Sequence, residues 1–522
     1  MTLNLQNVDD AKKKLERCDT SVFADIGSGF KYFVRQMKIN SFRHINDLSI
    51  SFEHPVTVIA GTNKTGKTSL LLLLACSHEQ FKKIDSTSPT PSLRDHSWSD
   101  VISFTSHETS SNNYSYELDW RVGAQNRRGE GKRLITSKAW SGLGKKSSDV
   151  SRLNAKIRER EVRLIDLERM LPSRSFTNAL FRKANSANRE RLNSDIEEAF
   201  AYIFDLVAVE IYAVGSHINK SCFLVSRNNS PTYSTFNAAT GEESLISLLK
   251  DVIDSPQNSL ILIDEIEAGF HPSVQRKLAD VIQYIAWQHK KQFVITTHSP
   301  TTLSAFPSNS RRFIERNGNE YRVYSGLSPQ AARSKMDMVG YPLVQLYCED
   351  DLASFLIKQV LKKMSRTQPF FHRVFNIVES GPIDQVKNDY VRHQRNFKQF
   401  AGRLGFCAVF DGDHIAHMGF RIYDQNPEEH TIFLYPHEAP EKFLVRSYLS
   451  VNNNEALAAA LAHADHHTLF EKMTELGIAS DNKDALSQCY RAFEQSQYYV
   501  RHEAELQDFF IRINTYFSEL AD

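Results

Sequence analysis

The chain has 522 residues, enough for about two to four domains with hydrophobic cores of their own. Its 63 Lys and Arg nearly balance 62 Asp and Glu, so any DNA contact must come from local patches. The six cysteines show no Cys-x-x-Cys spacing, which argues against a zinc site or a disulfide framework and predicts a cytoplasmic protein. The start lacks the basic and apolar runs of a signal peptide, and we expect no membrane role.

The first predicted elements lead into a phosphate-binding loop. Residues 11–18 are helix-prone and residues 33–52 predict two strands. An apolar strand at 56–60 then precedes Gly61-Thr62-Asn63-Lys64-Thr65-Gly66-Lys67-Thr68, and a helix follows from Ser69. Such a loop turns backbone N–H groups toward phosphate oxygens. The sequence therefore predicts a nucleoside triphosphate with Mg²⁺, and the predicted nucleotide-binding residues are Asn63, Lys64, Thr65, Gly66, Lys67, Thr68 and Ser69, with Lys67 on the β- and γ-phosphates and Thr68 also on the metal.

The next stretch predicts an insertion in this nucleotide-binding head, at about residues 86–205. Between residues 86 and 148 the composition shifts to Ser, Thr, Asn and Gly, and the alternation at 114–122 predicts an antiparallel β-ribbon. Residues 151–204 predict basic helices, with Arg160 and Arg163 in the first cluster of charges. A basic helix face is either an ordinary solvated surface or a surface for nucleic acid or a partner, and both interpretations stay open.

A second nucleotide motif is an apolar strand at 259–263 that ends in Asp264 and Glu265. Asp264 at the end of a buried strand can hold the magnesium ion, directly or through water. Glu265 can polarise the water that attacks the γ-phosphate. The upstream phosphate loop favours this interpretation over a strand that merely ends in solvated acids.

Two further segments suit the same site. The strand at 292–297 runs into His298, at the carboxyl edge where open α/β sheets bind ligands, and this predicts a γ-phosphate sensor. Thr240 and Gly241 precede an apolar helical run at 245–252. A helix that begins with a hydroxyl residue and a glycine offers an anion-binding N-terminus.

The C-terminal half repeats a strand–helix rhythm that predicts a small parallel-sheet domain, with strands at 343–348, 373–378, 406–410 and 431–435 and helices at 352–364 and 383–400. Glu349 follows the first strand, and Asp411-Gly412-Asp413 follows the third. Oxygen ligands at one edge of a sheet suit Mg²⁺ or Mn²⁺, and such ions can activate water for phosphodiester cleavage. Asp-Gly-Asp alone is more often a structural turn, but with Glu349 in the same unit we interpret it as a metal site.

The last part of the chain predicts helices from residue 454 to the end. It includes the sequence His463-Ala464-Asp465-His466-His467, which looks like a metal-binding cluster. The cytoplasmic setting and the lack of partner cysteines favour a solvated helix end instead.

The head motifs together resemble the ABC-type ATPase heads of the RecF, SMC and OLD group. In that group two heads sandwich ATP, each phosphate loop facing the partner's signature segment. The resemblance therefore implies ATP as the nucleotide and a homodimer or higher homo-oligomer. The signature usually reads Ser-Gly-Gly, whereas this chain has Ala239-Thr240-Gly241, so Thr240 would stand in for the serine.

The acids of the C-terminal half resemble those of a TOPRIM domain, whose metal ligands are a Glu after the first strand and an Asp-x-Asp after a later one. The resemblance implies that Glu349 is a base or ligand and that Asp411 and Asp413 are metal ligands. OLD-type nucleases place a further metal-site acid and a lysine beyond the last strand. That pattern implies roles for Glu441 and Lys442, with Glu438 as another candidate.

A head followed by TOPRIM is the architecture of the OLD (overcoming lysogenization defect) family of ATP-dependent nucleases. The expected α/β fold has an ABC-type P-loop ATPase head at 1–335, a TOPRIM-like nuclease domain at 341–450 and a helical segment at 451–522. The resemblance implies an ATP-controlled, Mg²⁺- or Mn²⁺-dependent DNA endonuclease or nickase in anti-phage defence. Members of the family act alone or with a partner, such as a helicase or a retron reverse transcriptase with its DNA. The alternative is a regulatory ATPase that docks or restrains a separate toxin or nuclease, with an inactive TOPRIM domain.

Overall fold

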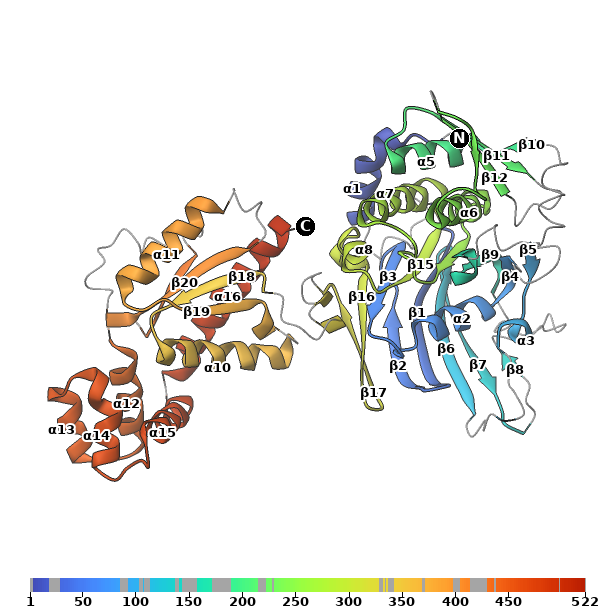
Figure 1. Ribbon diagram of the computed structural model, residues 1–522. Helices are drawn as coiled ribbons and strands as arrows, with labels where there is room; N and C mark the ends of the chain where they lie inside the picture. Colours follow the sequence, from blue (N-terminus) through green and yellow to red (C-terminus); the bar gives the residue numbers. More distant parts are fainter. Residues whose placement is uncertain are drawn as a thin grey trace. The chain divides into compact units, whose positions relative to one another are not determined.

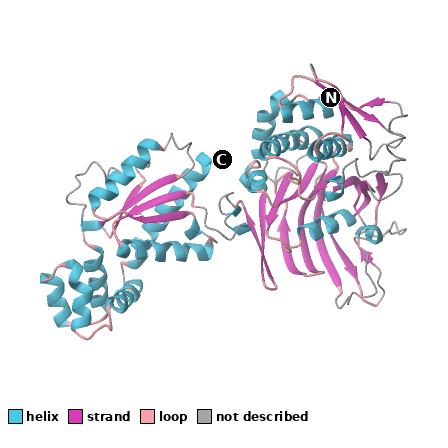
Figure 2. Cartoon of the chain, viewed as in Figure 1, coloured by secondary structure: helices cyan, strands magenta, loops and turns pink. Residues whose placement is uncertain are grey.

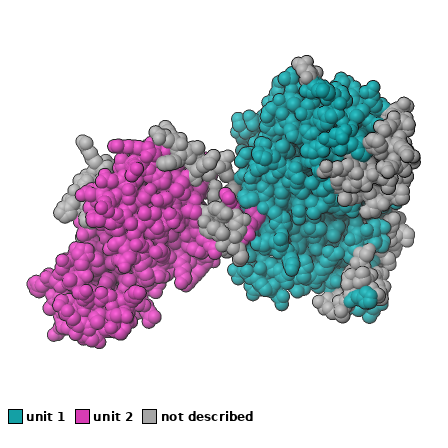
Figure 3. All heavy atoms as spheres, viewed as in Figure 1, with its two compact units in different colours: residues 1–332 teal, residues 333–522 magenta. Residues whose placement is uncertain are grey.

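The computed structural model divides the chain into two compact units, Met1–Ala332 (unit 1) and Arg333–Asp522 (unit 2), which Figure 3 distinguishes by colour. The residues that it describes are 3–17, 29–84, 93–102, 107, 113–136, 140–142, 157–170, 189–214, 222–227, 230–327, 332–333, 335–336, 342–368, 371–397, 404–413, 430–435, 438–496 and 498–521. No helix among them is long and apolar enough to cross a membrane.

The centre of unit 1 is an eight-stranded sheet in the order β17-β16-β3-β15-β14-β9-β4-β5 (Figure 1). The six strands from β16 to β4 run parallel, and β17 and β5 add an antiparallel strand at each edge. Strands β3, β14 and β15 are buried along their whole length, as apolar strands covered on both faces should be. The bounds are β3 (Val56–Gly61), β4 (His78–Ile84), β5 (Leu93–Asp95), β9 (Ile157–Ile165), β14 (Leu260–Ile263), β15 (Gln292–Thr297), β16 (Arg311–Asn317) and β17 (Glu320–Ser325).

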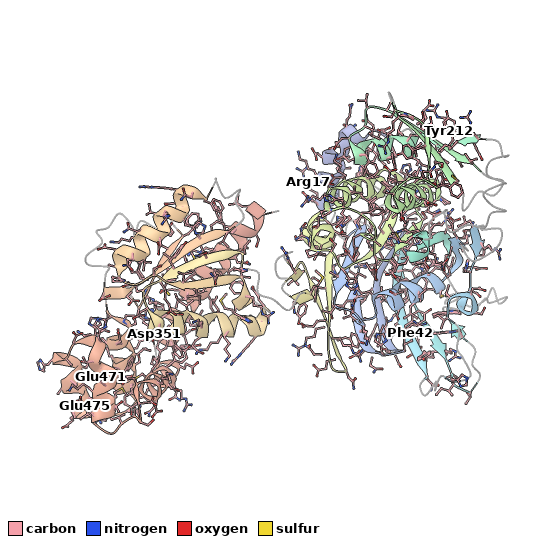
Figure 4. All side chains as sticks on the ribbon, in the orientation of Figure 1. Arg17, Phe42, Tyr212, Asp351, Glu471 and Glu475 are labelled. Carbon is pink, nitrogen blue, oxygen red and sulfur yellow. The ribbon has the colours of Figure 1, made fainter. Side chains whose placement is uncertain are left out.

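A second, antiparallel sheet has the order β2-β1-β6-β7-β8, with β1 (Tyr32–Phe42), β2 (Ile45–Ser51), β6 (Tyr114–Val122), β7 (Gln125–Arg133) and β8 (Trp140–Gly142). The predicted ribbon at 114–122 is confirmed, but it pairs with β1 and so continues the sheet of the head. Phe42, labelled in Figure 4, packs edge-on against Tyr114 with ring centroids 5.3 Å apart. One hydrophobic core joins this sheet to the leucines of α2 (Lys67–Cys76) and to the central sheet.

The other helices of unit 1 include α7 (Pro272–His289), which begins with Pro272 at a first-turn position and has His271 as its N-cap. It packs against α1 and α5, and α5 packs against α6. A small antiparallel sheet has the order β10-β11-β12-β13. The remaining bounds are η1 (Leu5–Asn7), α1 (Val8–Glu16), α3 (Trp98–Val101), η4 (Leu167–Met170), β10 (Arg189–Arg191), α5 (Ser194–Phe204), β11 (Val209–Val214), β12 (Cys222–Arg227), β13 (Tyr233–Ser234), α6 (Thr240–Asp254), α8 (Pro300–Ser304) and η6 (Ser308–Ser310).

The prediction of basic helices at 151–204 is right about the helical state of α5. It is wrong for Ile157–Ile165, which forms β9 in the central sheet, and for Arg189–Arg191, which forms β10. Arg160 and Arg163 are buried in β9. Arg163 donates to Glu161 at 2.5 Å, and Arg160 donates to the Gln292 side chain at 3.1 Å. Because these charges are satisfied inside the fold, the segment lacks the alternating apolar pattern of a half-exposed strand. The two basic clusters at 152–156 and 182–183 lie outside the described residues.

Unit 2 contains the predicted parallel sheet, in the order β19-β18-β20-β21. All three pairings are parallel, and the bounds are β18 (Val344–Cys348), α10 (Asp351–Thr367), η7 (Phe371–Arg373), β19 (Phe375–Glu379), α11 (Ile383–Asn396), β20 (Gly405–Asp411) and β21 (Thr431–Leu434). Figure 2 shows these strands in magenta among helices in cyan. The carboxyl ends of β18 and β20 therefore lie next to each other at one edge of the sheet.

The predicted C-terminal helices are confirmed as α13 (Glu455–His463), η11 (His466–Thr468), α14 (Leu469–Glu475), α15 (Asn482–Gln495) and α16 (Tyr499–Ala521), and they are preceded by α12 (Pro440–Val451), which was not predicted from the sequence. One hydrophobic core joins them to the parallel sheet. At Gly405 a β-carbon would collide with the ring of Phe517, which shows how closely α16 packs on β20. Unit 2 is thus a sheet domain whose helical appendage belongs to the same core.

Candidate nucleotide site and acidic cluster

The phosphate loop connects β3 to α2. Gly66 is the N-cap of α2 in a left-handed conformation, with φ 90°, and a β-carbon there would collide with Ile45. A β-carbon at Gly61 would lie 2.5 Å from the carbonyl oxygen of Ile314 on β16. Both glycines are therefore required by the close packing of the loop, and together they leave its backbone open for phosphate.

Lys67 points back to the loop, where its Nζ donates to the carbonyl oxygens of Gly61 at 2.9 Å and Thr62 at 3.0 Å. Burial lowers the pKa of this ammonium group to about 8, against the opposing charges of Asp264 and Glu265. A triphosphate would replace the two carbonyl contacts with stronger, charge-assisted ones. The geometry thus suits a lysine held ready for phosphate.

The predicted magnesium residues are in contact. Thr68 Oγ1 donates to Asp264 Oδ2 at 2.9 Å, and Thr296 Oγ1 donates to Asp264 Oδ1 at 2.5 Å. Both oxygens of the carboxylate are oriented before any metal binds. A hydroxyl from the phosphate loop beside a strand-end carboxylate is the oxygen donor set that Mg²⁺ prefers next to a phosphate chain.

Glu265 and His298 lie next to each other, with 3.9 Å between Glu265 Oε1 and His298 Nε2. Glu265 has a left-handed backbone, φ 47°, and its N–H donates to Thr296 Oγ1 at 2.9 Å. Burial, and then the charge of Lys67, lower the pKa of His298 below its ordinary value, so the imidazole is neutral near pH 7. A carboxylate and a neutral imidazole at one sheet edge are groups that can orient water and a phosphate oxygen.

Glu267 also belongs to this site, although its position in the sequence predicted only a turn. Its two carboxylate oxygens accept from the His298 backbone N–H at 2.5 Å and from Thr297 Oγ1 at 2.7 Å. Glu267 therefore connects the turn after β14 to the end of β15. Glu267 lies two residues after Glu265, the predicted catalytic acid, and this spacing could have indicated a role in the site.

Arg169 on η4 is a second residue that the sequence did not indicate. Its guanidinium donates to the backbone carbonyl oxygens of Asp264 at 2.9 Å and Glu265 at 2.5 Å. Burial lowers its pKa below the ordinary value, opposed by the surrounding acids. Because η4 follows β9, the neighbour of β14, this arginine holds the acidic strand end from the adjacent strand.

The predicted signature residues, Thr240 and Gly241, form the first turn of α6. A β-carbon at Gly241 would lie 2.6 Å from the carbonyl oxygen of Gly269, in the turn between β14 and α7. The start of α6 therefore packs closely on the segment that follows Glu267. The next residue, Glu242, forms an ion pair with Arg227, with 2.6 Å between Glu242 Oε1 and Arg227 Nη2.

In unit 2 the strand-end acids meet as predicted for Glu349 and Asp411. The Asp411 N–H donates to Glu349 Oε1 at 3.1 Å. Burial, and then the charges of Glu349, Asp350, Glu441 and Asp413, raise the pKa of Asp411 to about 9. In the described structure Asp411 Oδ1 is buried without a hydrogen bond. This carboxyl group is surrounded by acids, the environment that a divalent cation would neutralise.

Gly412 separates Asp411 from Asp413 for a steric reason. A β-carbon there would collide with the carbonyl oxygen of Tyr435 and lie 2.5 Å from that of Leu434, at the end of β21. Asp350, next to Glu349, caps α10 by accepting from the Ala353 N–H at 2.8 Å. The tight backbone contact and the cap fix the two segments that carry the acids.

The remaining predicted site residues of this domain form two groups, one that acts on Asp411 and one around Glu438. Glu441 is buried in the first turn of α12, and its charge acts on Asp411. Glu438 pairs with Arg446, and Lys442 contributes charge at Glu438, whose pKa burial raises. Among the described residues, the group whose ligand atoms all lie within 4.8 Å is Glu441, His466 and His467, rather than one that includes Glu349, Asp411 and Asp413.

Comparisons with known proteins agree with the fold of unit 1. Residues 56–304 match the family described as "AAA domain, putative AbiEii toxin, Type IV TA system". No curated protein matches the chain. Solved structures similar to it include the SMC head domain from Thermotoga maritima, at 10% identity with a TM-score of 0.34, covering 56% of this chain and 98% of that one. The Smc head domain with an extended coiled coil from Pyrococcus furiosus, bound to the C-terminal domain of ScpA, has 10% identity and a TM-score of 0.37, over 56% and 96%.

These observations define the class of unit 1. The family match covers β3 to α8 and includes the phosphate loop, the acidic strand end and His298. Together with the parallel sheet that carries these segments, the match supports an ATP-binding ATPase domain of the AAA type in unit 1. The α/β fold class is confirmed in both units.

Proposed function

We propose that the chain is an ATP-controlled, divalent-metal-dependent DNA endonuclease or nickase of the OLD type that acts in defence against phage. The observation that carries the proposal is the half-buried acid pair at the ends of β18 and β20, where Glu349 accepts a hydrogen bond from the Asp411 backbone. Acids gathered at the carboxyl edge of a parallel sheet are costly without a cation. Unit 2 in this interpretation is a TOPRIM-like nuclease domain.

Each acid has a proposed role in cleavage. Asp411 and Asp413 would hold Mg²⁺ or Mn²⁺, and Glu349 would serve as ligand or base. A bound divalent ion supplies Lewis acidity toward the phosphodiester and lowers the pKa of water. Glu441, whose charge already acts at Asp411, would add a fourth carboxylate. Lys442 is proposed as a cationic group near the scissile phosphate, with less support because its charge acts at Glu438.

The head would control this chemistry through ATP. Lys67 and the loop N–H groups would bind the phosphates, Thr68 and Asp264 would hold the magnesium ion, and Glu265 would polarise the attacking water. His298 would act as the sensor of the γ-phosphate. A second copy of the chain would close the site through Thr240 and Gly241, so the working form would be a homodimer or higher homo-oligomer.

The test is cleavage of supercoiled plasmid by purified protein with ATP and either Mg²⁺ or Mn²⁺, with an Asp411→Asn variant in parallel. We expect nicked or linear DNA from the wild type and none from the variant. Glu320→Gln, an exposed acid on β17 in unit 1, is the matched control and should cut normally. Intact plasmid with all three proteins, including in the presence of a co-expressed partner, would refute the nuclease function.

A regulatory ATPase that docks or restrains a separate toxin or nuclease is the second candidate. Its support is that, among the described residues, Glu349, Asp411 and Asp413 do not have their ligand atoms within 4.8 Å of one another. The matched family is also described as that of a toxin in a toxin–antitoxin system. This candidate predicts ATP hydrolysis without DNA cleavage, and co-purification of a second protein that unit 2 binds.

A further inference from the structure

A second group of metal-type ligands lies in unit 2, and it includes Glu441, whose charge also acts on Asp411. One carboxylate oxygen of Glu441 and one nitrogen each of His466 and His467 lie within 4.8 Å of one another. We propose that these three side chains bind a divalent transition-metal ion, with zinc as the best-fitting ion. The proposal stands whether or not the chain cleaves DNA, because it concerns metal binding alone.

Glu441 provides the negative charge of this site. Its side chain is only 9% exposed, and its Oε1 lies 3.5 Å from His467 Nδ1. A carboxylate removed from water requires a compensating cation or several hydrogen bonds. A metal ion between the carboxylate and the imidazole would supply that positive charge.

The two imidazoles are adjacent, with ring centroids 3.9 Å apart and planes inclined by 41°. Asp465 Oδ1 lies 3.4 Å from His466 Nδ1. A carboxylate beside a ligating histidine is the usual group that fixes the orientation of its ring.

The backbone holds the histidines in a defined turn. The Asp465 side chain accepts from the His467 N–H at 3.2 Å, and Thr468 Oγ1 donates to the Asp465 carbonyl at 2.8 Å. Leu469, the next residue, is fully buried in the core of unit 2. It begins α14, which Figure 4 marks with Glu471 and Glu475. The ligands therefore come from two elements, α12 and η11, that are anchored in one core.

The ligand types select the ion. Two imidazoles and one carboxylate are a zinc donor set that leaves one position open, whereas Mg²⁺ prefers oxygen ligands alone. Tetrahedral ligands about 2.0–2.1 Å from zinc stand ~3.3 Å apart. The 3.5 Å between Glu441 and His467 is close to that separation. The all-oxygen acids around Asp411 would instead select Mg²⁺ or Mn²⁺.

The experiment uses the full chain freed of metal with a chelator, and measures binding of zinc alone by calorimetry and of cobalt(II) by its visible absorption. We expect one site per chain, with affinity lowered at least about tenfold by His467→Ala and by His466→Ala. His463→Ala removes an exposed imidazole from the end of α13 and should bind as the wild type does. Asp411→Asn should also keep the site.

Zinc affinity that is unchanged in both histidine variants would overturn the proposal, as would an equal loss in Asp411→Asn. Because His467 is 69% exposed, its substitution should leave the fold intact, and the unfolding temperature without metal checks this. Zinc binding that persists in a protein unable to cut DNA would remove the nuclease function and keep this site. A wild-type protein that cuts DNA but binds no zinc would remove this site and keep the nuclease function.

Discussion

The two candidate sites differ in how the charge of their acidic side chains is balanced. In unit 1 the acids are matched inside the chain: Asp264 accepts hydrogen bonds from Thr68 and Thr296, and Arg169 lies against the same strand end. In unit 2 Asp411 is buried among other acids, and its pKa is raised to about 9. The side chains of the nucleotide site are thus already paired with one another, whereas we propose that the acidic cluster takes up a cation.

Removing the lysine of the phosphate loop should have the largest effect. We expect Lys67→Ala to reduce ATP affinity and hydrolysis by about a hundredfold or more, because the side chain is the loop's own buried cation. Binding of a fluorescent ATP analogue and phosphate release measure the two effects. Lys14→Ala, on the exposed face of α1, is the control and should behave as the wild type. Normal ATP binding by Lys67→Ala would refute the assigned site.

Glu265→Gln should separate binding from hydrolysis. The amide keeps the shape of the side chain but cannot polarise water as a carboxylate does, so we expect hydrolysis to fall by about 10² to 10³ while ATP remains bound. The measurement is single-turnover hydrolysis with the enzyme in excess. A variant that hydrolyses ATP at the normal rate would show that the general base is another group.

Glu267→Ala should have a smaller effect on the same reaction. Loss of this carboxylate frees the His298 backbone and Thr297, so the imidazole is held less firmly toward the γ-phosphate. We expect roughly tenfold slower hydrolysis with little change in ATP affinity, as for a positioning residue. Glu267→Gln, which can still accept one hydrogen bond, should recover part of the rate. Equal loss in both variants would contradict a positioning role.

Asp411→Asn should have a small effect on stability, in the stabilising direction. Because its pKa of about 9 means that folding must protonate this carboxyl group near pH 7, an amide removes that cost, and the metal-free variant should unfold a few degrees higher than the wild type. Mg²⁺ should raise the unfolding temperature of the wild type and leave that of the variant unchanged. Scanning calorimetry in chelator and in Mg²⁺ gives both comparisons. An equal response to Mg²⁺ would place the metal elsewhere.

The sequence predicted those parts of the fold whose residues follow local rules. The apolar strands β14 and β15, the glycines of the phosphate loop and the alternating strands and helices of unit 2 each have a pattern within about ten residues. Strand β9 has no such pattern, because its charged residues are satisfied by Glu161 and by Gln292 on another strand.

The residues of the candidate sites also differ in whether a local sequence pattern identifies them. Motif residues such as Lys67, Asp264 and Asp411 were identifiable from what precedes them in the chain. Arg169 was not, because its contact with the end of β14 spans 95 residues. The contact between Glu441 and His467 joins α12 to a turn beyond α13, which no local pattern shows. The lack of partner cysteines had instead favoured a solvated helix end for the histidines.

The measurement that tests the central claim most directly is plasmid cleavage by the wild type, Lys67→Ala and Asp411→Asn, each with Mg²⁺ and with or without ATP. The account predicts that Asp411→Asn never cuts. It also predicts that the wild type cuts at rates that differ with and without ATP, and that Lys67→Ala loses this difference while keeping its second site. Cutting by Asp411→Asn at the wild-type rate, or wild-type cutting that is indifferent to ATP, would contradict an ATP-controlled nuclease.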